Sequence, residues 1–407
     1  LSGEFYATEG EYIRLTCGNF DYQNNCFKEN KSKDNLYYVG DFRSEFLMEE
    51  GDIITPLTKQ AIGLLGSTAI IPESGKYIQS QDVAKIVCKE DLLDKNFAFY
   101  LISSALVKQQ LSAAAQQTKI RHTSPDKIKD CTVWIPELSE QKCIGKLLRS
   151  IDSKIELNRQ INQNLEAMAK QLYDYWFVQF DFPNEDGKPY KSSGGAMVWN
   201  EKLKRDIPAS WKTKAIEDIA DVYNGATPST INEQNYGGDI VWITPKDLSD
   251  QKQKFVYQGE RNISQAGYNS CSTHLLPPNT ILMSSRAPIG LLSIAKTELC
   301  TNQGFKSFVP KAENISTYLY YYLNIHIKQI EQLGTGTTFK EVSREDVLKF
   351  PILKPSDAIL DLWEKQVSAL NNKQFVIQKE NEFLTKQRDE LLPLLMNGQV
   401  SVNSDLS

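Results

Sequence analysis

The chain repeats itself at a period of more than two hundred residues, and this duplication constrains its fold more than any other feature. Three blocks return in the same order at offsets of 228, 227 and 219 residues. A fourth match sets Ile135-Pro136 against Lys354-Pro355. A period this long indicates two copies of a whole domain rather than solenoid repeats of about 20–50 residues. The three blocks are 11–16 (EYIRLT) with 239–244 (DIVWIT), 62–65 (IGLL) with 289–292 (IGLL), and 118–124 (TKIRHTS) with 337–343 (TTFKEVS).

Each copy combines short strands with helices. Apolar runs bounded by turn residues, such as 51–54 and 279–283, predict β-strands. Helical stretches follow at about 96–115 in the first copy and about 317–333 in the second. Ser124 before Pro125 is typical of a helix N-cap, and Ser343 with Asp346 resembles a capping box. Each copy is therefore expected to be a mixed α/β globule.

A long amphipathic helix is expected after each copy. Apolar residues recur at alternating spacings of three and four, which predicts coiled-coil packing over about five heptads. Polar members of the seam fix the register, and Pro393 is expected to end or kink the second helix. The alternative is that each helix packs only on its own domain, but its length of roughly 50–60 Å disfavours this. The two seams are Ile144, Leu148, Ile151, Ile155, Asn158, Asn162, Leu165, Ala169, Leu172, Trp176 and Trp363, Val367, Leu370, Gln374, Ile377, Asn381, Leu384, Arg388, Leu391, Leu395.

These patterns divide the chain into six parts. Turn formers gather between the copies, which predicts a connecting loop there. The predicted parts are a first domain at 1–137, a long helix at 138–180, a connecting loop at 181–208, a second domain at 209–355, a second long helix at 356–396 and a tail at 397–407.

Composition excludes several classes of protein. The sequence contains no run of about 18 apolar residues, so no membrane-spanning helix is predicted. The net charge of −5 excludes a strongly basic nucleic-acid coat, although a local basic groove remains possible. Seven scattered cysteines without a C-x-x-C pair favour free thiols in a reducing cytoplasm. The sequence has only three histidines, and they are far apart, which disfavours a histidine-based metal site or catalytic triad.

Catalytic motifs are also missing from the sequence. There is no phosphate-binding G-x-x-x-x-G-K-[ST] loop, and Pro277-Pro278 does not fit the motif of an adenine methyltransferase. We therefore expect no catalytic site and no cofactor. One loose pattern, Pro125-Asp126 followed by Glu140-Gln-Lys142, formally matches the carboxylates of a metal-dependent nuclease. We favour the interpretation that these residues are ordinary surface charges.

Five segments follow one another in a characteristic order: 165–177, 219–229 (IADVYNGATPS), 283–290 (MSSRAPIG), 302–304 (NQG) and 334–338 (GTGTT). In this order, and together with the duplication, they resemble the specificity subunit of type I restriction–modification systems. The resemblance implies two target-recognition domains, each reading one half of a split DNA site. It also implies that the two helices pair antiparallel, act as a ruler and dock two modification subunits, giving the chain approximate two-fold symmetry.

The first copy departs from this pattern at its start. About 30 residues precede Asp239 when counted from Ala209, but only ten precede Glu11. The opening strand-and-turn element of the second copy is therefore not found in the first. With Leu1 in place of Met, a truncated start is expected.

The candidate DNA contacts are polar residues in the loops. Arg reads guanine, Asn and Gln read adenine, and Lys, Arg and hydroxyl groups hold phosphates. The expected partners are double-stranded DNA, two methyltransferase (modification) subunits and restriction (motor/nuclease) subunits. Two alternatives stay open: each residue is simply a solvated surface group, or the chain is a coiled-coil adaptor without a DNA role. The candidates are Lys59, Gln117, Thr118, Lys119, Arg121, Lys246, Arg286, Thr335, Thr337, Thr338 and Lys340.

Overall fold

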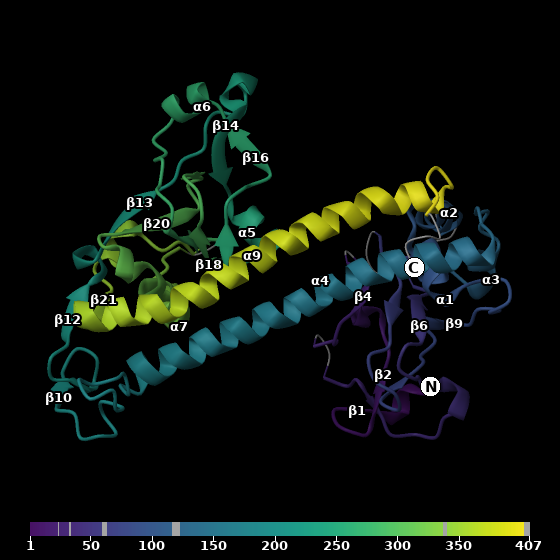
Figure 1. Cartoon of the computed structure of the whole chain (residues 1–407), viewed down its shortest axis with the longest axis horizontal. Helices are drawn as coiled ribbons and strands as arrows, with labels where there is room; N and C mark the ends of the chain where they lie inside the picture. The colour runs from purple at the N-terminus through teal and green to yellow at the C-terminus, as the bar shows by residue number, and fades with distance from the viewer. Residues whose placement is uncertain (23, 32–33, 59–62, 116–122, 337–339, 403–407) are drawn as a thin grey trace. The chain divides into compact units, whose positions relative to one another are not determined.

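The computed structural model describes residues 1–407 apart from 23, 32–33, 59–62, 116–122, 337–339 and 403–407 (Figure 1). The chain divides into two compact units. Unit 1 comprises residues 1–157 and 381–407, and unit 2 comprises residues 158–380. Each unit combines small sheets with helices, so the predicted class of two mixed α/β domains with long helices is confirmed. In the part of the chain that the structure describes, no helix is both long and apolar enough to span a bilayer.

Unit 1 contains two small sheets and a hairpin. The sheets have the strand orders β1-β5-β2-β8 and β7-β6-β9, and β3 pairs with β4. The strands are β1 (Tyr6–Ala7), β2 (Tyr12–Arg14), β3 (Phe20–Asp21), β4 (Cys26–Phe27), β5 (Tyr37–Tyr38), β6 (Ile53–Pro56), β7 (Ala69–Ile70), β8 (Tyr77–Ile78) and β9 (Val83–Ile86). The helices are α1 (Lys95–Ser103), α2 (Ala105–Ala115), α3 (Pro125–Lys129), the first part of α4 (Leu138–Tyr173) and the end of α9 (Asp357–Met396).

Unit 2 is built around a five-stranded sheet with the order β13-β20-β17-β18-β15. Smaller sheets are β16-β14-β19, β12-β21 and the hairpin β10-β11. The strands are β10 (Met197–Asn200), β11 (Arg205–Pro208), β12 (Lys212–Ala215), β13 (Ala220–Asn224), β14 (Tyr236–Ile243), β15 (Phe255–Val256), β16 (Arg261–Ile263), β17 (Ile281–Ser285), β18 (Ile289–Ala295), β19 (Cys300–Thr301), β20 (Phe305–Pro310) and β21 (Pro351–Lys354). The helices within the unit are α5 (Pro245–Gln251), α6 (Gln265–Asn269), α7 (Ser316–Gln332) and α8 (Arg344–Leu348).

Strand pairing supports the duplication. In unit 1, β6 lies between β7 and β9 and pairs antiparallel with both. In unit 2, β17 lies between β18 and β20 in the same way. Ile53 of β6 and Ile281 of β17 hold equivalent places, since each aligns with one residue of both neighbouring strands. The central strand of this sheet therefore has the same pairing in both units.

The predicted helix caps are present in both units. The Ser124 hydroxyl accepts a hydrogen bond from the Lys127 backbone N–H at the start of α3, and Ser343 accepts one from Asp346 at the start of α8. The Asp346 carboxylate accepts from the Ser343 hydroxyl at 2.6 Å, so the reciprocal bond of a capping box is replaced by a side-chain bond.

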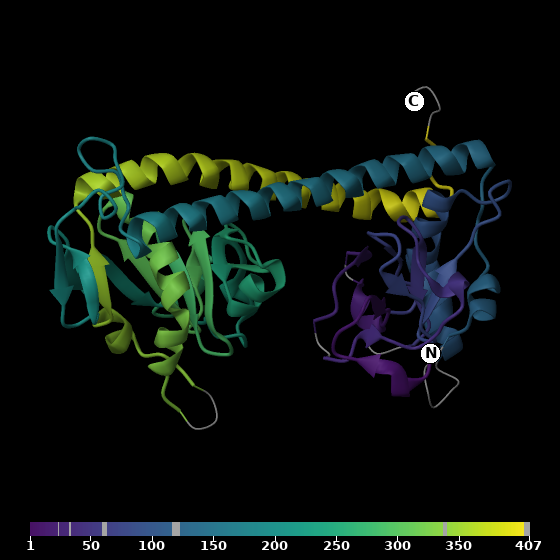
Figure 2. The ribbon, with the colours of Figure 1, turned by 90° about the horizontal axis from the view of Figure 1, so that it is seen from below.

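The two long helices run antiparallel wherever they touch (Figure 2). In unit 1, Arg388 donates to Asp152 at 2.9 Å and Asn381 donates to the backbone carbonyl of Ile155 at 3.3 Å. The residue number rises along α4 as it falls along α9. In unit 2, Asn158 donates to Glu380 at 2.8 Å, which continues the same trend.

Polar residues of the seam bind the opposite backbone. The Asn162 amide donates to the Gln374 carbonyl at 3.3 Å, and the Gln374 amide donates to the Asn162 carbonyl at 3.2 Å. Because each bond requires one particular residue opposite the other, this reciprocal pair selects a single register. Most apolar seam positions are buried, and Ile151, Leu172, Leu370, Leu384 and Leu391 are half-buried.

The ends of the helices also belong to the cores of the units. Tyr173 of α4 and Trp363 of α9 are buried in unit 2, where their rings pack 5.7 Å apart. Leu395 and Met396 of α9 lie in the core of unit 1 beside Ile144. The long helices therefore contribute both to the domain cores and to the helix–helix seam.

Three local predictions require correction. Pro393, expected to end or kink the second helix, does not end α9, which continues to Met396. The first predicted helix is broken at Ser104, whose extended backbone stops α1 while its hydroxyl accepts from the Val107 N–H at the start of α2. The segment 181–208, predicted as a connecting loop, contains the hairpin of β10 and β11, so its second half is regular structure.

Candidate nucleic-acid interface

Several loops meet at one edge of the five-stranded sheet in unit 2. Strands β13 and β17 end there, while β20 and β18 begin there. The register aligns Asn224 with Lys306, Ser284 with Phe305, and Ser285 with Ile289. We call this border the loop edge. It consists of residues 225–229, 286–288, 302–304 and the described parts of 334–341.

The segment before α8 is fastened to the loop edge. The Val342 N–H donates to the Ser285 carbonyl at 3.1 Å. Thr335 and Glu341 exchange two backbone hydrogen bonds, at 3.1 and 3.0 Å, and so form an isolated antiparallel bridge. Residues 335 and 340–341 are thus held beside the turn that follows β17.

The carboxylate of Glu341 lies close to two cationic side chains of the loop edge. The Glu341 carboxylate lies 3.2 Å from Lys306 Nζ and 3.8 Å from an Arg286 guanidinium nitrogen. Lys306 is buried, whereas Arg286 and Glu341 are each about two-fifths exposed. Glu341 therefore positions the Arg286 guanidinium while leaving part of it open to a ligand.

Two segments of the loop edge, 225–229 and 302–304, pass very close to each other. A Cβ atom on Gly225 would lie 2.1 Å from the Asn302 carbonyl oxygen, so only glycine allows this approach. Beyond the crossing, the Thr227 hydroxyl donates to the Gln303 side-chain oxygen. Gln303 is exposed and its amide nitrogen is oriented by that bond. An exposed, positioned amide is the group that reads adenine in a major groove.

Helix α5 begins next to the same edge. The Asn302 N–H donates to the Ile243 carbonyl at 3.0 Å, and Pro245 packs against Gly304. Thr244 caps α5 through a capping box with Asp247. Lys246 is exposed on the first turn and pairs with Glu260 at 2.8 Å. Lys246 therefore adjoins the loop edge but is partly neutralised.

The structure brings together only part of the predicted site. Arg286, Thr335 and Lys340 lie at the loop edge, and Lys246 lies beside it. Thr227, Gln303 and Lys306 were missed, although 225–229 and 302–304 stand out as short polar turns between strands. The candidates outside the described residues are Lys59, Gln117, Thr118, Lys119, Arg121, Thr337 and Thr338.

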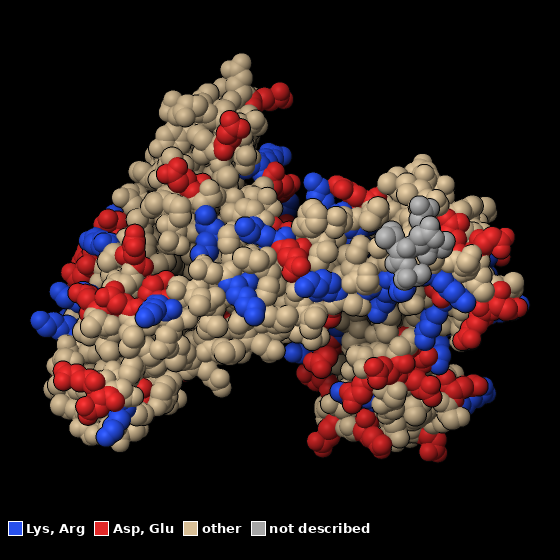
Figure 3. All heavy atoms as spheres, in the orientation of Figure 1, with Lys and Arg blue, Asp and Glu red and all other residues tan. Residues whose placement is uncertain are grey.

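Charges near the loop edge are mixed rather than strongly positive. Arg286 and Lys306 share the Glu341 carboxylate, and Lys246 beside the edge pairs with Glu260. On the face of the molecule that Figure 3 draws, Lys and Arg are likewise interspersed with Asp and Glu. Tight binding to a polyanion needs several neutralised phosphates. This surface is therefore suited to specific contacts more than to strong nonspecific attraction.

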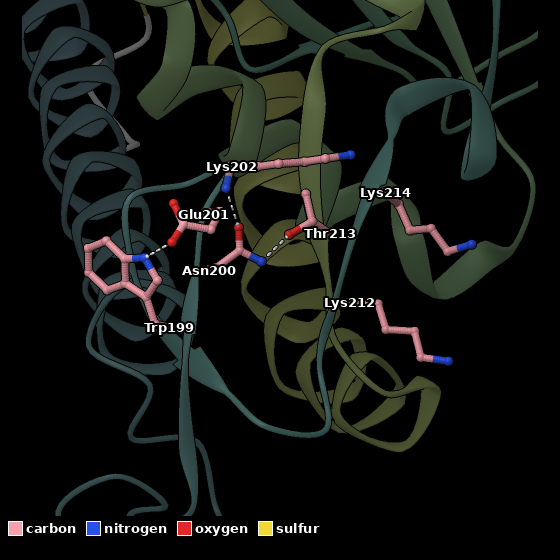
Figure 4. A pocket seen from close by; sticks show the side chains of 7 residues that line it. All are labelled: Trp199, Asn200, Glu201, Lys202, Lys212, Thr213 and Lys214. Atoms are coloured by element: carbon pink, nitrogen blue, oxygen red, sulfur yellow. Dashed lines mark hydrogen bonds between the residues drawn. The ribbon is translucent and has the colours of Figure 1, made fainter.

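A pocket lies between the hairpin β10-β11 and β12. It has a volume of about 510 Å³ and carries three lysines, Lys202, Lys212 and Lys214 (Figure 4). Asn200 donates to the Thr213 hydroxyl at 2.8 Å, and the Trp199 indole donates to Glu201 at 2.9 Å. The pocket is open to solvent, and its lining resembles a solvated basic patch.

The nuclease-like carboxylates lie on two helices of unit 1. Asp126 is exposed on α3 and pairs with Lys129 at 3.7 Å, while Glu140 stands in the first turn of α4. Within the described ranges, no group of three or more His, Cys, Asp or Glu residues is arranged to hold a metal ion.

Comparison with known proteins gives a consistent assignment. The family model of the type I restriction modification DNA specificity domain matches residues 10–167 and again residues 208–381. The chain is 27% identical over 380 residues to the type I restriction enzyme HindI specificity subunit of Haemophilus influenzae, covering 80% of this chain and 81% of that protein. It is 38% identical over 203 residues to the MjaIX specificity subunit of Methanocaldococcus jannaschii, covering 47% of this chain and only 46% of that relative. A solved type I restriction–modification S subunit from M. genitalium shares the fold, with a TM-score of 0.62, 16% identity, and coverage of 97% of this chain and 91% of that chain.

Proposed function

Because the chain belongs to the family of the type I restriction modification DNA specificity domain, we propose that it is the DNA-recognition subunit of a type I restriction–modification complex. The double match of a DNA specificity domain is the observation that carries this proposal. Each domain reads one half of a divided DNA site. The comparisons give no support to the alternative of an adaptor without a DNA role.

In unit 2 the reading surface is the loop edge. Gln303 offers an oriented amide to a base, Arg286 offers a guanidinium to guanine or phosphate, and Lys340 offers a charge to phosphate. In this proposal the partner subunits, and not this chain, carry out methylation and cleavage. The net charge of −5 supports this division, since the partner subunits then provide part of the phosphate neutralisation.

Helices α4 and α9 set the gap between the half-sites and dock two modification subunits, with restriction subunits joining the full complex. Exposed apolar side chains on these helices support a docking role. They are Leu157, Met168, Val376 and Phe383, each more than half exposed.

The dependence of DNA affinity on salt concentration distinguishes phosphate binding from base reading at the loop edge. In the assembled complex with a methyltransferase partner, Lys340→Ala should reduce the slope of log affinity against log salt by about one unit. Gln303→Ala should leave that slope unchanged and reduce discrimination at one base pair by about 1–3 kcal/mol. Binding is measured by titrating labelled duplexes at several salt concentrations.

Lys204→Ala is the matched control for this experiment. Lys204 is an exposed lysine of unit 2 that pairs with Glu201 on the β10–β11 turn, away from the loop edge. Its substitution should change neither slope nor discrimination. An unchanged slope for Lys340→Ala together with unchanged discrimination for Gln303→Ala would place DNA elsewhere.

The purified chain alone should neither methylate nor cut DNA. The physical reason is that methyl transfer needs a bound methyl donor and a pocket for the flipped base, and the sequence has no motif for either. Incorporation of labelled methyl groups into target DNA measures this, with the assembled complex as the positive control. Methylation by the chain without a partner would contradict the proposal.

A further inference from the structure

The loop between β13 and β14, residues 225–235, exposes an isoleucine almost completely. Ile231 is 94% exposed, more than any other large apolar side chain in the part of the chain that the structure describes. Apolar side chains stabilise a fold by leaving water, so this one adds no such stabilisation to unit 2. A ligand with an apolar surface at this point would remove the side chain from water and gain binding free energy from it.

Hydrogen bonds hold the backbone on both sides of Ile231. On the far side, Asn232 caps the short helix of residues 233–235 by accepting from the Gln234 N–H. On the near side, three side chains each donate to a backbone carbonyl of the loop. The pairs are Trp242 with Ala226 at 3.1 Å, Tyr236 with Pro228 at 2.8 Å, and Asn235 with Ser229 at 2.9 Å. A loop ordered in this way loses less conformational entropy when it binds.

The same loop carries part of the surface proposed to read bases. Its first half, residues 225–229, belongs to the loop edge, where the Thr227 hydroxyl orients Gln303. Ile231 follows Thr227 by four residues, and a chain of that length spans at most about 14 Å. About four base pairs, at roughly 3.4 Å each, cover the same distance. Ile231 therefore lies within about four base pairs of the position at which Gln303 would meet a base.

The loop around Ile231 is polar and nearly uncharged. Glu233 is the one charged residue among residues 225–235, which contain no Lys or Arg. Neutralisation of DNA phosphates requires Lys or Arg, so this loop is better suited to bases than to phosphates. In the major groove the base edges are polar except for the 5-methyl group of thymine. An exposed isoleucine close to polar reading groups therefore matches that methyl group.

We propose that Ile231 is a specificity-determining residue that contacts the 5-methyl group of a thymine in the half-site read by unit 2. This role rests on the proposed function, because it requires DNA at the loop edge. Contact with the methyl group distinguishes thymine from cytosine, which carries only hydrogen at the same ring carbon. Ile231 thus adds apolar reading of one base to the polar reading by Gln303.

Replacing thymine by uracil tests the contact, since uracil lacks only the 5-methyl group and pairs with adenine in the same way. Duplexes with one deoxyuridine in place of each thymidine of the mapped half-site in turn are titrated into the assembled complex with a methyltransferase partner. At one position we expect uracil to weaken binding by the parent about threefold to tenfold, as for the loss of one buried methyl group. Ile231→Ala should weaken binding to the thymine duplex by a similar factor and abolish the effect of uracil at that position.

Two further variants show whether the effect belongs to this side chain. Ile231→Val keeps a branched apolar group and should retain the uracil effect. Ile325→Ala is the matched control, because Ile325 is an isoleucine on α7 that is 42% exposed and lies outside the β13–β14 loop. This control should bind the thymine and uracil duplexes as the parent does.

The outcomes separate this role from the proposed function. An equal uracil effect in the parent and Ile231→Ala complexes, or no thymine whose methyl group matters to the parent, would overturn the role of Ile231 and leave the proposed function intact. Failure of the Ile231→Ala chain to assemble with the methyltransferase partner in size-exclusion chromatography would assign the side chain to a protein contact and overturn it too. Failure of the parent complex to prefer its mapped site would overturn both.

Discussion

Inserting four residues into each long helix, after Leu157 in α4 and after Glu380 in α9, should widen the gap between the two half-sites by about one or two base pairs. Four helical residues add about 6 Å, and one base pair rises about 3.4 Å. Both insertion points flank the Asn158–Glu380 hydrogen bond, so the antiparallel pairing on either side keeps its partners. A four-residue insertion is tolerated as a local change in supercoiling.

The measurement is to map methylated sites across a genome for the parent and for the variant. Both half-site sequences should stay the same while the gap between them grows. The control inserts the same four residues at the exposed turn of Glu185 and Asp186, outside the helices, and should leave the gap unchanged. A variant that kept the parental gap, or changed a half-site sequence, would refute the idea that the helices measure the spacing.

Replacing Lys254 by alanine should lower the free energy of unfolding by about 3 kcal/mol, the range found when one partner of a buried ion pair is removed. The Lys254 ammonium is 2.7 Å from Glu166 on α4, 2.6 Å from the Tyr321 hydroxyl on α7 and 2.8 Å from Asn371 on α9. Burial lowers the pKa of Lys254, and the Glu166 carboxylate opposes that shift. This one side chain links the second domain to both long helices.

Chemical denaturation followed by tryptophan fluorescence suits this test, since five of the six tryptophans lie in unit 2. Lys365→Ala, an exposed change on α9, is the control and should shift stability by less than about 0.5 kcal/mol. Lys254→Met should cost less than Lys254→Ala, because the methionine fills the channel of the lysine stem. A loss below about 1 kcal/mol for alanine would mean that solvent already screens this pair.

Local patterns in the sequence identified the long helices, the caps and the duplication. The three-and-four spacing from Ile144 to Trp176 depends only on neighbours within one helix, so it predicts which face is buried. The Lys254 contacts could not be predicted in this way, because they join residues more than 60 positions apart through the packing of α7 on the sheet. The same holds for Gln303, whose partner Thr227 is 76 residues away.

Other predictions, of where helices and loops begin and end, were wrong because local sequence signals conflicted. Proline usually breaks a helix, but α9 continues beyond Pro393. The backbone N–H of Asn397 donates to the Pro393 carbonyl at 3.1 Å. At Ser104 the opposite occurred, since a hydroxyl able to cap the next helix interrupted an otherwise helical stretch. The hairpin at 197–208 was overlooked because turn formers dominate the segment before it.

Unit 1 is assembled from both ends of the chain, and this has a consequence for biosynthesis. Its core contains Leu395 and Met396, which leave the ribosome long after Phe97 and Ile144, the residues against which they pack. The core of unit 1 is therefore incomplete until residues 395–396 have been translated. A nascent or prematurely terminated chain would hold unit 2 nearly whole but leave unit 1 open.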